Sequence, residues 1–179
     1  MKNIIIFLLM FFINQWCFAQ WKEDELKPYK QKAENEIKSY TDKMIKSGKW
    51  DKKYDALEIE FITDTMRIER TASLIDNERY STADMHNTLS FRMTEYDKLL
   101  NKYYKLLMNK LSDEDKTKFR EAQRVWLKYR DSEEKINSEI IAPNRYTGGG
   151  TMWPLVARGR TLEIIKERVC NFYEFIKYI

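Results

Sequence analysis

The spacing of the apolar residues is the feature that most constrains the fold of this 179-residue chain. Between residues 22 and 176 they recur every three or four positions, which is the repeat of an amphipathic α-helix rather than of a strand. The chain has five glycines and three prolines, so it has little material for the many turns that a sheet requires. The sequence therefore predicts an all-α protein, a small helical bundle of about five helices.

The breaks in this repeat locate the expected helices, at about residues 22–46, 52–77, 83–111, 112–140 and 154–176. Ser81 and Ser112 each precede an aspartate by three positions, which is typical of a helix N-terminus, and Gly48 suits a C-terminal cap. Because only a few residues join the third and fourth helices, we expect an antiparallel hairpin. This hairpin and the last helix form the predicted compact unit, residues 80–179. Residues 20–79 form an N-terminal helical hairpin or extension.

Residues 1–19 have the three parts of a secretory signal peptide. Lys2 supplies a positive charge, residues 4–13 form an unbroken apolar run, and Cys17 and Ala19 are small residues at the positions that precede cleavage. The apolar run is too short to span a bilayer. We therefore expect cleavage after Ala19, no stable membrane insertion, and a periplasmic or secreted protein. A short membrane anchor is the alternative.

Cysteine content and charge restrict the partners and the source of stability. Cleavage after Ala19 leaves Cys170 as the single cysteine, so no internal disulfide can form and packing must stabilise the fold. We expect Cys170 to be a buried, inert thiol, with pairing between chains as the alternative. The formal net charge is +4, but basic and acidic residues are interspersed. This pattern and export both argue against nucleic acid as a partner.

The sequence contains no assembled set of metal-binding or catalytic residues. A zinc site needs three or four suitable ligands, and His86 is the one histidine, so we expect a solvated His86, no metal and no cofactor. Residues 148–151 (Gly-Gly-Gly-Thr) lack the lysine of a phosphate-binding loop. Asp131, Glu133 and Glu134 lie on one helix, whereas glycoside hydrolysis needs two carboxyls that face each other. The protein is therefore predicted not to be an enzyme.

Glu133 interrupts the apolar stripe of the fourth predicted helix, so its carboxylate is expected to reach solvent, to pair with a cation or to have a raised pKa. The expected cationic partners are arginines of three helices, namely Arg92, Arg130, Arg158 and Arg160. The ion pair would fix the register of the helices, or the carboxylate would lie at the rim of a binding cleft. The aromatic members of the stripes are expected in the core; they are Tyr96, Tyr103, Phe119, Trp126 and Tyr129.

The longest predicted loop carries a different group of large side chains. Tyr146, Met152 and Trp153 lie beside its glycines, between Pro143 and Pro154. Exposed aromatic residues at a flexible loop are typical of a protein interface or a sugar-stacking site. The alternative is that the loop folds back over the end of the bundle and buries them.

The order of three motifs resembles the LprI-type lysozyme-inhibitor family. Residues 96–104 (Tyr-Asp-Lys-Leu-Leu-Asn-Lys-Tyr-Tyr) are similar to its first helical motif, and residues 123–131, which contain Gln-x-x-Trp-x-x-x-Arg-Asp, to its second. Residues 148–151 resemble its glycine loop, and Arg168 takes the place of a late helix arginine. The resemblance covers about residues 81–175. It implies a small exported helical domain and, for the member that names the family, lysozyme inhibition.

This resemblance suggests a binding site at the fourth helix and the loop. The expected binding residues are Trp126, Arg130, Asp131, Glu133, Tyr146, Gly148, Gly149, Gly150, Thr151 and Trp153. They would act by occluding the active site of a lysozyme. The chain departs from the family near Thr88 and Glu134, where cysteines are expected, so it lacks the family's disulfide framework. Two alternatives are an envelope adaptor that binds another exported protein through residues 20–79, and a cell-wall enzyme.

Overall fold

A computed structural model describes residues 21–143, 146 and 150–179, and within these residues every regular element is helical. The helices are α1 (Glu23–Lys46), α2 (Ala56–Glu78), α3 (Thr82–Lys110), α4 (Asp113–Ile136), the π-helix η1 (Asn137–Ile141) and α5 (Trp153–Tyr178). The predicted all-α fold is confirmed. The predicted caps are also confirmed, because the Ser81 and Ser112 hydroxyls accept hydrogen bonds from the Asp84 and Asp115 amides. Gly48 follows α1 with a φ of 72°.

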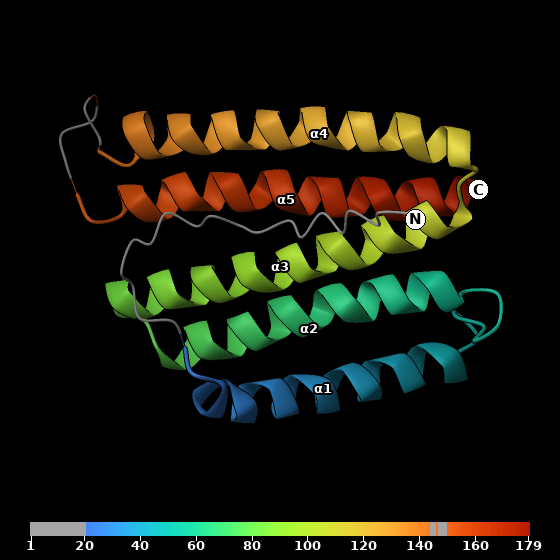
Figure 1. Cartoon of the computed structure of the whole chain (residues 1–179). Helices are drawn as coiled ribbons and strands as arrows, with labels where there is room; N and C mark the ends of the chain where they lie inside the picture. The colour runs from blue at the N-terminus through green and yellow to red at the C-terminus, as the bar shows by residue number, and fades with distance from the viewer. Residues whose placement is uncertain (1–20, 144–145, 147–149) are drawn as a thin grey trace.

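The helices lie side by side in the order α4, α5, α3, α2, α1 (Figure 1). The chain turns back after α3, so α4 runs antiparallel to it as predicted, but α5 lies between the two. Tyr104 of α3 and Phe119 of α4 still approach each other near the connecting turn, with ring centroids 6.2 Å apart. The expected hairpin is therefore open along most of its length, and α5 fills it.

The core explains why α5 takes this position. Ile165, Val169 and Phe172 of α5 have exposed fractions of 0%, and Leu100 and Tyr103 of α3 are equally inaccessible, at 1% and 0%. The same cluster of buried side chains continues through α2 and reaches α1; its members there are Ile68, Ala72, Ile75 and Leu26. One continuous core thus includes the N-terminal helices and the C-terminal ones.

The inward face of α4 differs from the predicted one. Tyr129 was expected in the core, but it is 51% exposed, and Ile136 and Ile140 of the same stripe are 45% and 42% exposed. Gln123 and Asn137 are buried instead, at 4% and 2%. The reason is that the face of α5 that contacts α4 and η1 carries arginines, and these need polar partners rather than apolar ones.

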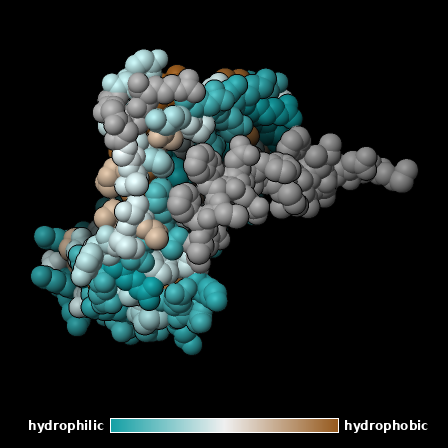
Figure 2. Space-filling model, turned by 90° about the vertical axis from the view of Figure 1, so that its left-hand side faces the viewer, coloured by the Kyte–Doolittle hydropathy of each residue, from teal (hydrophilic) through white to brown (hydrophobic). Residues whose placement is uncertain are grey.

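We call Val125, Tyr129, Ile136 and Ile140 the outer stripe; all four are more than 40% exposed. Figure 2 shows hydrophobic atoms at the top of the molecule, where α4 lies in Figure 1.

Two further expectations were wrong. His86 is 3% exposed rather than solvated, and Cys170 is exposed rather than buried. Among the described residues, no helix is long and apolar enough to cross a membrane.

Two tyrosines provide a test of this packing. We expect Tyr103→Ala to lower the free energy of unfolding by about 3–5 kcal/mol, because it removes a fully buried ring. Tyr129→Ala should change it by less than about 0.5 kcal/mol, because that side chain is half exposed. Urea unfolding followed by circular dichroism measures both. A large loss for Tyr129→Ala would mean that the outer stripe is buried in solution.

Candidate functional site

The sequence-predicted site residues fall into two groups in the structure. Trp126, Arg130, Asp131 and Glu133 lie along α4, on its middle and last turns. Tyr146, Gly150, Thr151 and Trp153 lie at the end of the bundle where α4 and η1 finish and α5 begins; we call this the loop end (Figure 1). Gly148 and Gly149 lie outside the described residues. The two groups therefore lie on different parts of the molecule.

The middle of α4 is held on α5 by Arg168. Its Nε and Nη2 both donate to Oε1 of Gln123, at 3.0 and 2.9 Å. The guanidinium also lies over three aromatic rings, 4.8 Å from the centroid of Phe172, 5.5 Å from Trp126 and 5.8 Å from Phe119. Burial lowers the pKa of Arg168. Gln123 and Trp126 of the second motif thus satisfy a half-buried charge between two helices, which gives both residues a structural role.

Arg130 and Asp131 differ in their exposure. The Arg130 side chain is 11% exposed and lies 5.6 Å from the Trp126 ring centroid. It donates to Oδ1 of Asp131 at 2.6 and 2.9 Å, while the Asp131 side chain is 61% exposed. The pair therefore presents a carboxylate to solvent from an ordered position on α4.

Three of the arginines predicted as partners of Glu133 contact other polar groups. Arg92 pairs with Glu69 and Asp76, and Arg160 donates to the Asn137 side chain at 3.0 Å. Arg158 donates to the Ser90 hydroxyl at 2.7 Å and to the backbone oxygen of buried His86 at 3.4 Å. Each of these arginines thus has polar partners besides Glu133, and the register-fixing pair of Glu133 stays a prediction.

The sequence did not reveal that two carboxyls, those of Asp97 and Glu134, are half-buried. Burial raises the pKa of Glu134 on α4, although Arg130 and Arg158 act in the opposite direction. Burial also raises the pKa of Asp97 on α3, against a lowering effect of Arg130. One sequence signal could have indicated the burial of Glu134: it lies four residues after Arg130 and thus on the same face of the helix.

His86 is a third titratable group affected by burial. Burial lowers the pKa of His86, and the charge of Arg158 adds to this effect.

The loop end presents large side chains to solvent. Tyr146 is 83% exposed and Met152 is 53% exposed, whereas Trp153 is partly buried at the start of α5. Gly150 has a φ of 147°, a conformation that side chains rarely adopt, so this position requires glycine. Of the two aromatic residues that the loop was alternatively expected to bury, Trp153 is partly buried and Tyr146 is exposed.

A comparison with known families decides the relationship of the chain. The family model described as lysozyme inhibitor LprI matches residues 75–171, which are 97 of the 179 residues. The chain belongs to the LprI family. This confirms the resemblance, with slightly different limits from the predicted 81–175. No curated protein and no solved structure is significantly similar to the chain.

The LprI match extends from the last turn of α2 into α5, so it includes α3, α4, η1 and the loop end. It leaves out α1 and most of α2, which contribute Leu26, Ile68 and Ala72 to the same core. The described residues hold no group of three or more His, Cys, Asp or Glu side chains that would suit a metal ion.

The Arg168 arrangement predicts a stability effect for Gln123. Gln123→Ala should lower the free energy of unfolding by about 1–3 kcal/mol, because it leaves the half-buried guanidinium without its acceptor. Urea unfolding measures the change, and Glu121→Ala, at an exposed position of the same helix, is the control. Equal stabilities of the two variants would contradict the role assigned to Gln123.

Glu134 predicts a pH effect. A carboxyl with a raised pKa in the folded protein opposes folding once it ionises, so this cost is absent in acid and appears as the pH rises through the folded pKa. Glu134→Gln should therefore be more stable than the parent protein at pH 7. The difference should vanish below about pH 4, where the unfolded chain is also protonated. Thermal unfolding across this range tests it, with Glu139→Gln in η1 as the exposed control.

Proposed function

We propose that this protein is an exported, non-enzymatic binding protein of the cell envelope that inhibits a lysozyme by occluding its active site. The observation that carries the proposal is the LprI family match over residues 75–171. Export rests on the signal-peptide pattern of residues 1–19 and places the protein in the periplasm or outside the cell.

The loop end is the part of the molecule best suited to enter a cleft. Tyr146 is exposed, and rigid helices on both sides, η1 before it and α5 after it, fix the ends of the loop. A large side chain on a supported loop is a frequent source of binding energy at protein interfaces. We assign the contact to this loop; its residues are Tyr146, Gly148, Gly149, Gly150, Thr151 and Trp153.

The α4 group would act beside this contact rather than within it. Asp131 precedes the end of η1 by ten residues, which corresponds to roughly 15 Å along a helix. Its exposed carboxylate, oriented by Arg130, and the neighbouring Glu133 suit the flank of a large interface. Trp126 would support them from within the helix packing.

A second candidate function is that of an adaptor for another exported protein. The outer stripe favours it, because Val125, Tyr129, Ile136 and Ile140 expose large apolar side chains along one side of α4 and η1. This surface lies on α4, not on the N-terminal hairpin to which the sequence first assigned such a contact.

The inhibitor proposal predicts a loss of function without a loss of folding. The exported protein should slow the lysis of bacterial cell walls by a lysozyme, and Tyr146→Ala should weaken this inhibition at least about tenfold, the loss expected at an interface hot spot. Cell-wall turbidity measures the lysis rate. The lysozymes should include acidic and basic ones, because the chain's charge of +4 does not attract a basic partner.

The matched control is Tyr54→Ala. Tyr54 is 81% exposed, almost as much as Tyr146, but it lies in the α1–α2 connection at the opposite end of the bundle (Figure 1). Unchanged inhibition by Tyr146→Ala together with Trp153→Ala would exclude the loop end as the contact. No inhibition of any lysozyme would exclude the function itself and leave the adaptor as the candidate to test.

A further inference from the structure

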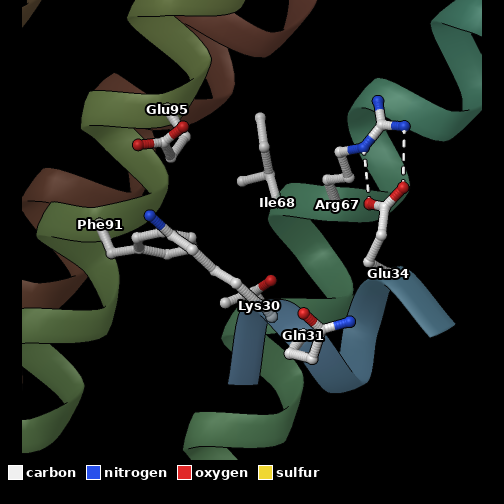
Figure 3. A pocket seen from close by; sticks show the side chains of 8 residues that line it. Lys30, Gln31, Glu34, Arg67, Ile68, Phe91 and Glu95 are labelled. Carbon is white, nitrogen blue, oxygen red and sulfur yellow. Dashed lines mark hydrogen bonds and ion pairs between the residues drawn. The ribbon is translucent and has the colours of Figure 1, made fainter. Parts of the chain in front are cut away.

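A second possible site lies away from the loop end, in the groove between α1 and α3. α2 forms its base, and the cavity has a volume of about 400 Å³ (Figure 3). The lining includes Lys30 and Gln31 of α1, Ile68 and Thr71 of α2, and Phe91 and Glu95 of α3. Small-molecule sites in proteins have volumes of about 300–1,000 Å³, so the cavity suits a small ligand.

The floor of this pocket is apolar except for one hydroxyl. Ile68 and Phe91 are 5% and 8% exposed, and Thr71 is 2% exposed. Among the described residues, none exchanges a hydrogen bond with the Thr71 hydroxyl, whereas Thr63 and Thr65 of the same helix donate to backbone oxygens one turn earlier. Among the described residues only Trp21 Nε1 and Gln123 Nε2 are buried polar side-chain atoms without a partner, so the Thr71 hydroxyl is open to the cavity that it lines, where a ligand can bond to it.

The rim carries one cation and one anion that can change partners. The Lys30 ammonium donates to both oxygens of Glu23 at 2.8 Å, and the Glu23 side chain is 77% exposed. The Glu95 carboxylate accepts from Lys98 at 2.6 Å, and the Lys98 side chain is 66% exposed. Such exposed pairs add little stability, so exchanging Glu23 or Lys98 for a ligand group costs little.

Arg67, the other cation of the lining, has its donors occupied. Its Nε donates to Glu34 at 2.9 Å and its Nη1 to Asp64 at 3.0 Å, and Figure 3 shows the guanidinium directed at Glu34. The exchangeable charges of the pocket are therefore a single positive group on α1 and a single negative group on α3.

We propose that this pocket binds a zwitterionic amino acid or dipeptide with an apolar side chain. The ligand carboxylate pairs with Lys30, its ammonium pairs with Glu95, and its side chain covers Ile68 and Phe91. The Thr71 hydroxyl bonds to a polar atom of the ligand backbone. Four of the six lining residues named above precede residue 75, so the site depends on helices that the LprI match leaves out.

Calorimetric titration of the whole exported protein with leucyl-leucine tests the proposal without any lysozyme. We expect saturable binding that is at least about tenfold weaker for the acetylated, amidated dipeptide, because capping removes both charges. Lys30→Gln and Glu95→Gln should each weaken binding of the free dipeptide by about tenfold. Equal binding of the free and capped dipeptides would overturn the charge assignment.

Thr71→Val separates a ligand contact from a structural role. It should weaken dipeptide binding about fivefold, because valine has the same shape but lacks the hydroxyl, and it should leave the melting temperature of the ligand-free protein nearly unchanged, because that hydroxyl has no protein partner to lose. Thr63→Val is the control, since Thr63 is also buried on α2 but its hydroxyl is already bonded. Thr63→Val should leave dipeptide affinity unchanged. No binding of leucine or leucyl-leucine, or the same affinity in Thr71→Val as in the parent protein, would overturn the proposal.

Discussion

The insertion of α5 between α3 and α4 is the interaction on which the rest of the structure depends. Its apolar face, with Ile165, Val169 and Phe172, is fully buried, largely against α3. Burying such side chains contributes about 1.5–3 kcal/mol each, which exceeds what the mostly polar inward face of α4 can provide. α3 therefore packs on α5 rather than on α4, the helix that follows it in the chain. This packing also fixes the positions of η1 and α5, between which the loop runs.

The arginines of α5 then determine how α4 is turned. Arg168 is satisfied by Gln123 and aromatic rings, and Arg160 by Asn137. A half-buried guanidinium without such partners would be costly, so α4 directs its polar side chains inward. The consequence is a surface of two kinds. The outer stripe and Tyr146 are exposed, while Trp126 and the Gln123 amide belong to the scaffold that holds the loop end in place.

The sequence could predict the features that depend on neighbouring residues, but not those that depend on contacts between helices. The helices, the serine caps at Ser81 and Ser112, and the family could be recognised because each depends on residues close together in the chain. The burial of Tyr129 and the exposure of His86 were predicted wrongly. A three- to four-residue repeat gives the direction of an apolar stripe on one helix, but it does not say whether a neighbouring helix covers that stripe.

The sequence by itself determined an all-helical LprI-family chain, because helix propensity, caps and motif spacing are local properties. Only the tertiary structure decided which faces meet. It placed α5 inside the predicted hairpin, and it joined residues of α1, α2 and α3 into one pocket, which Thr71 lines. Lys30 and Glu95 are 65 positions apart, and no local pattern indicates that they line one cavity. Their proximity results from the burial of α2 between two helices, which is decided by the free energy of the whole core.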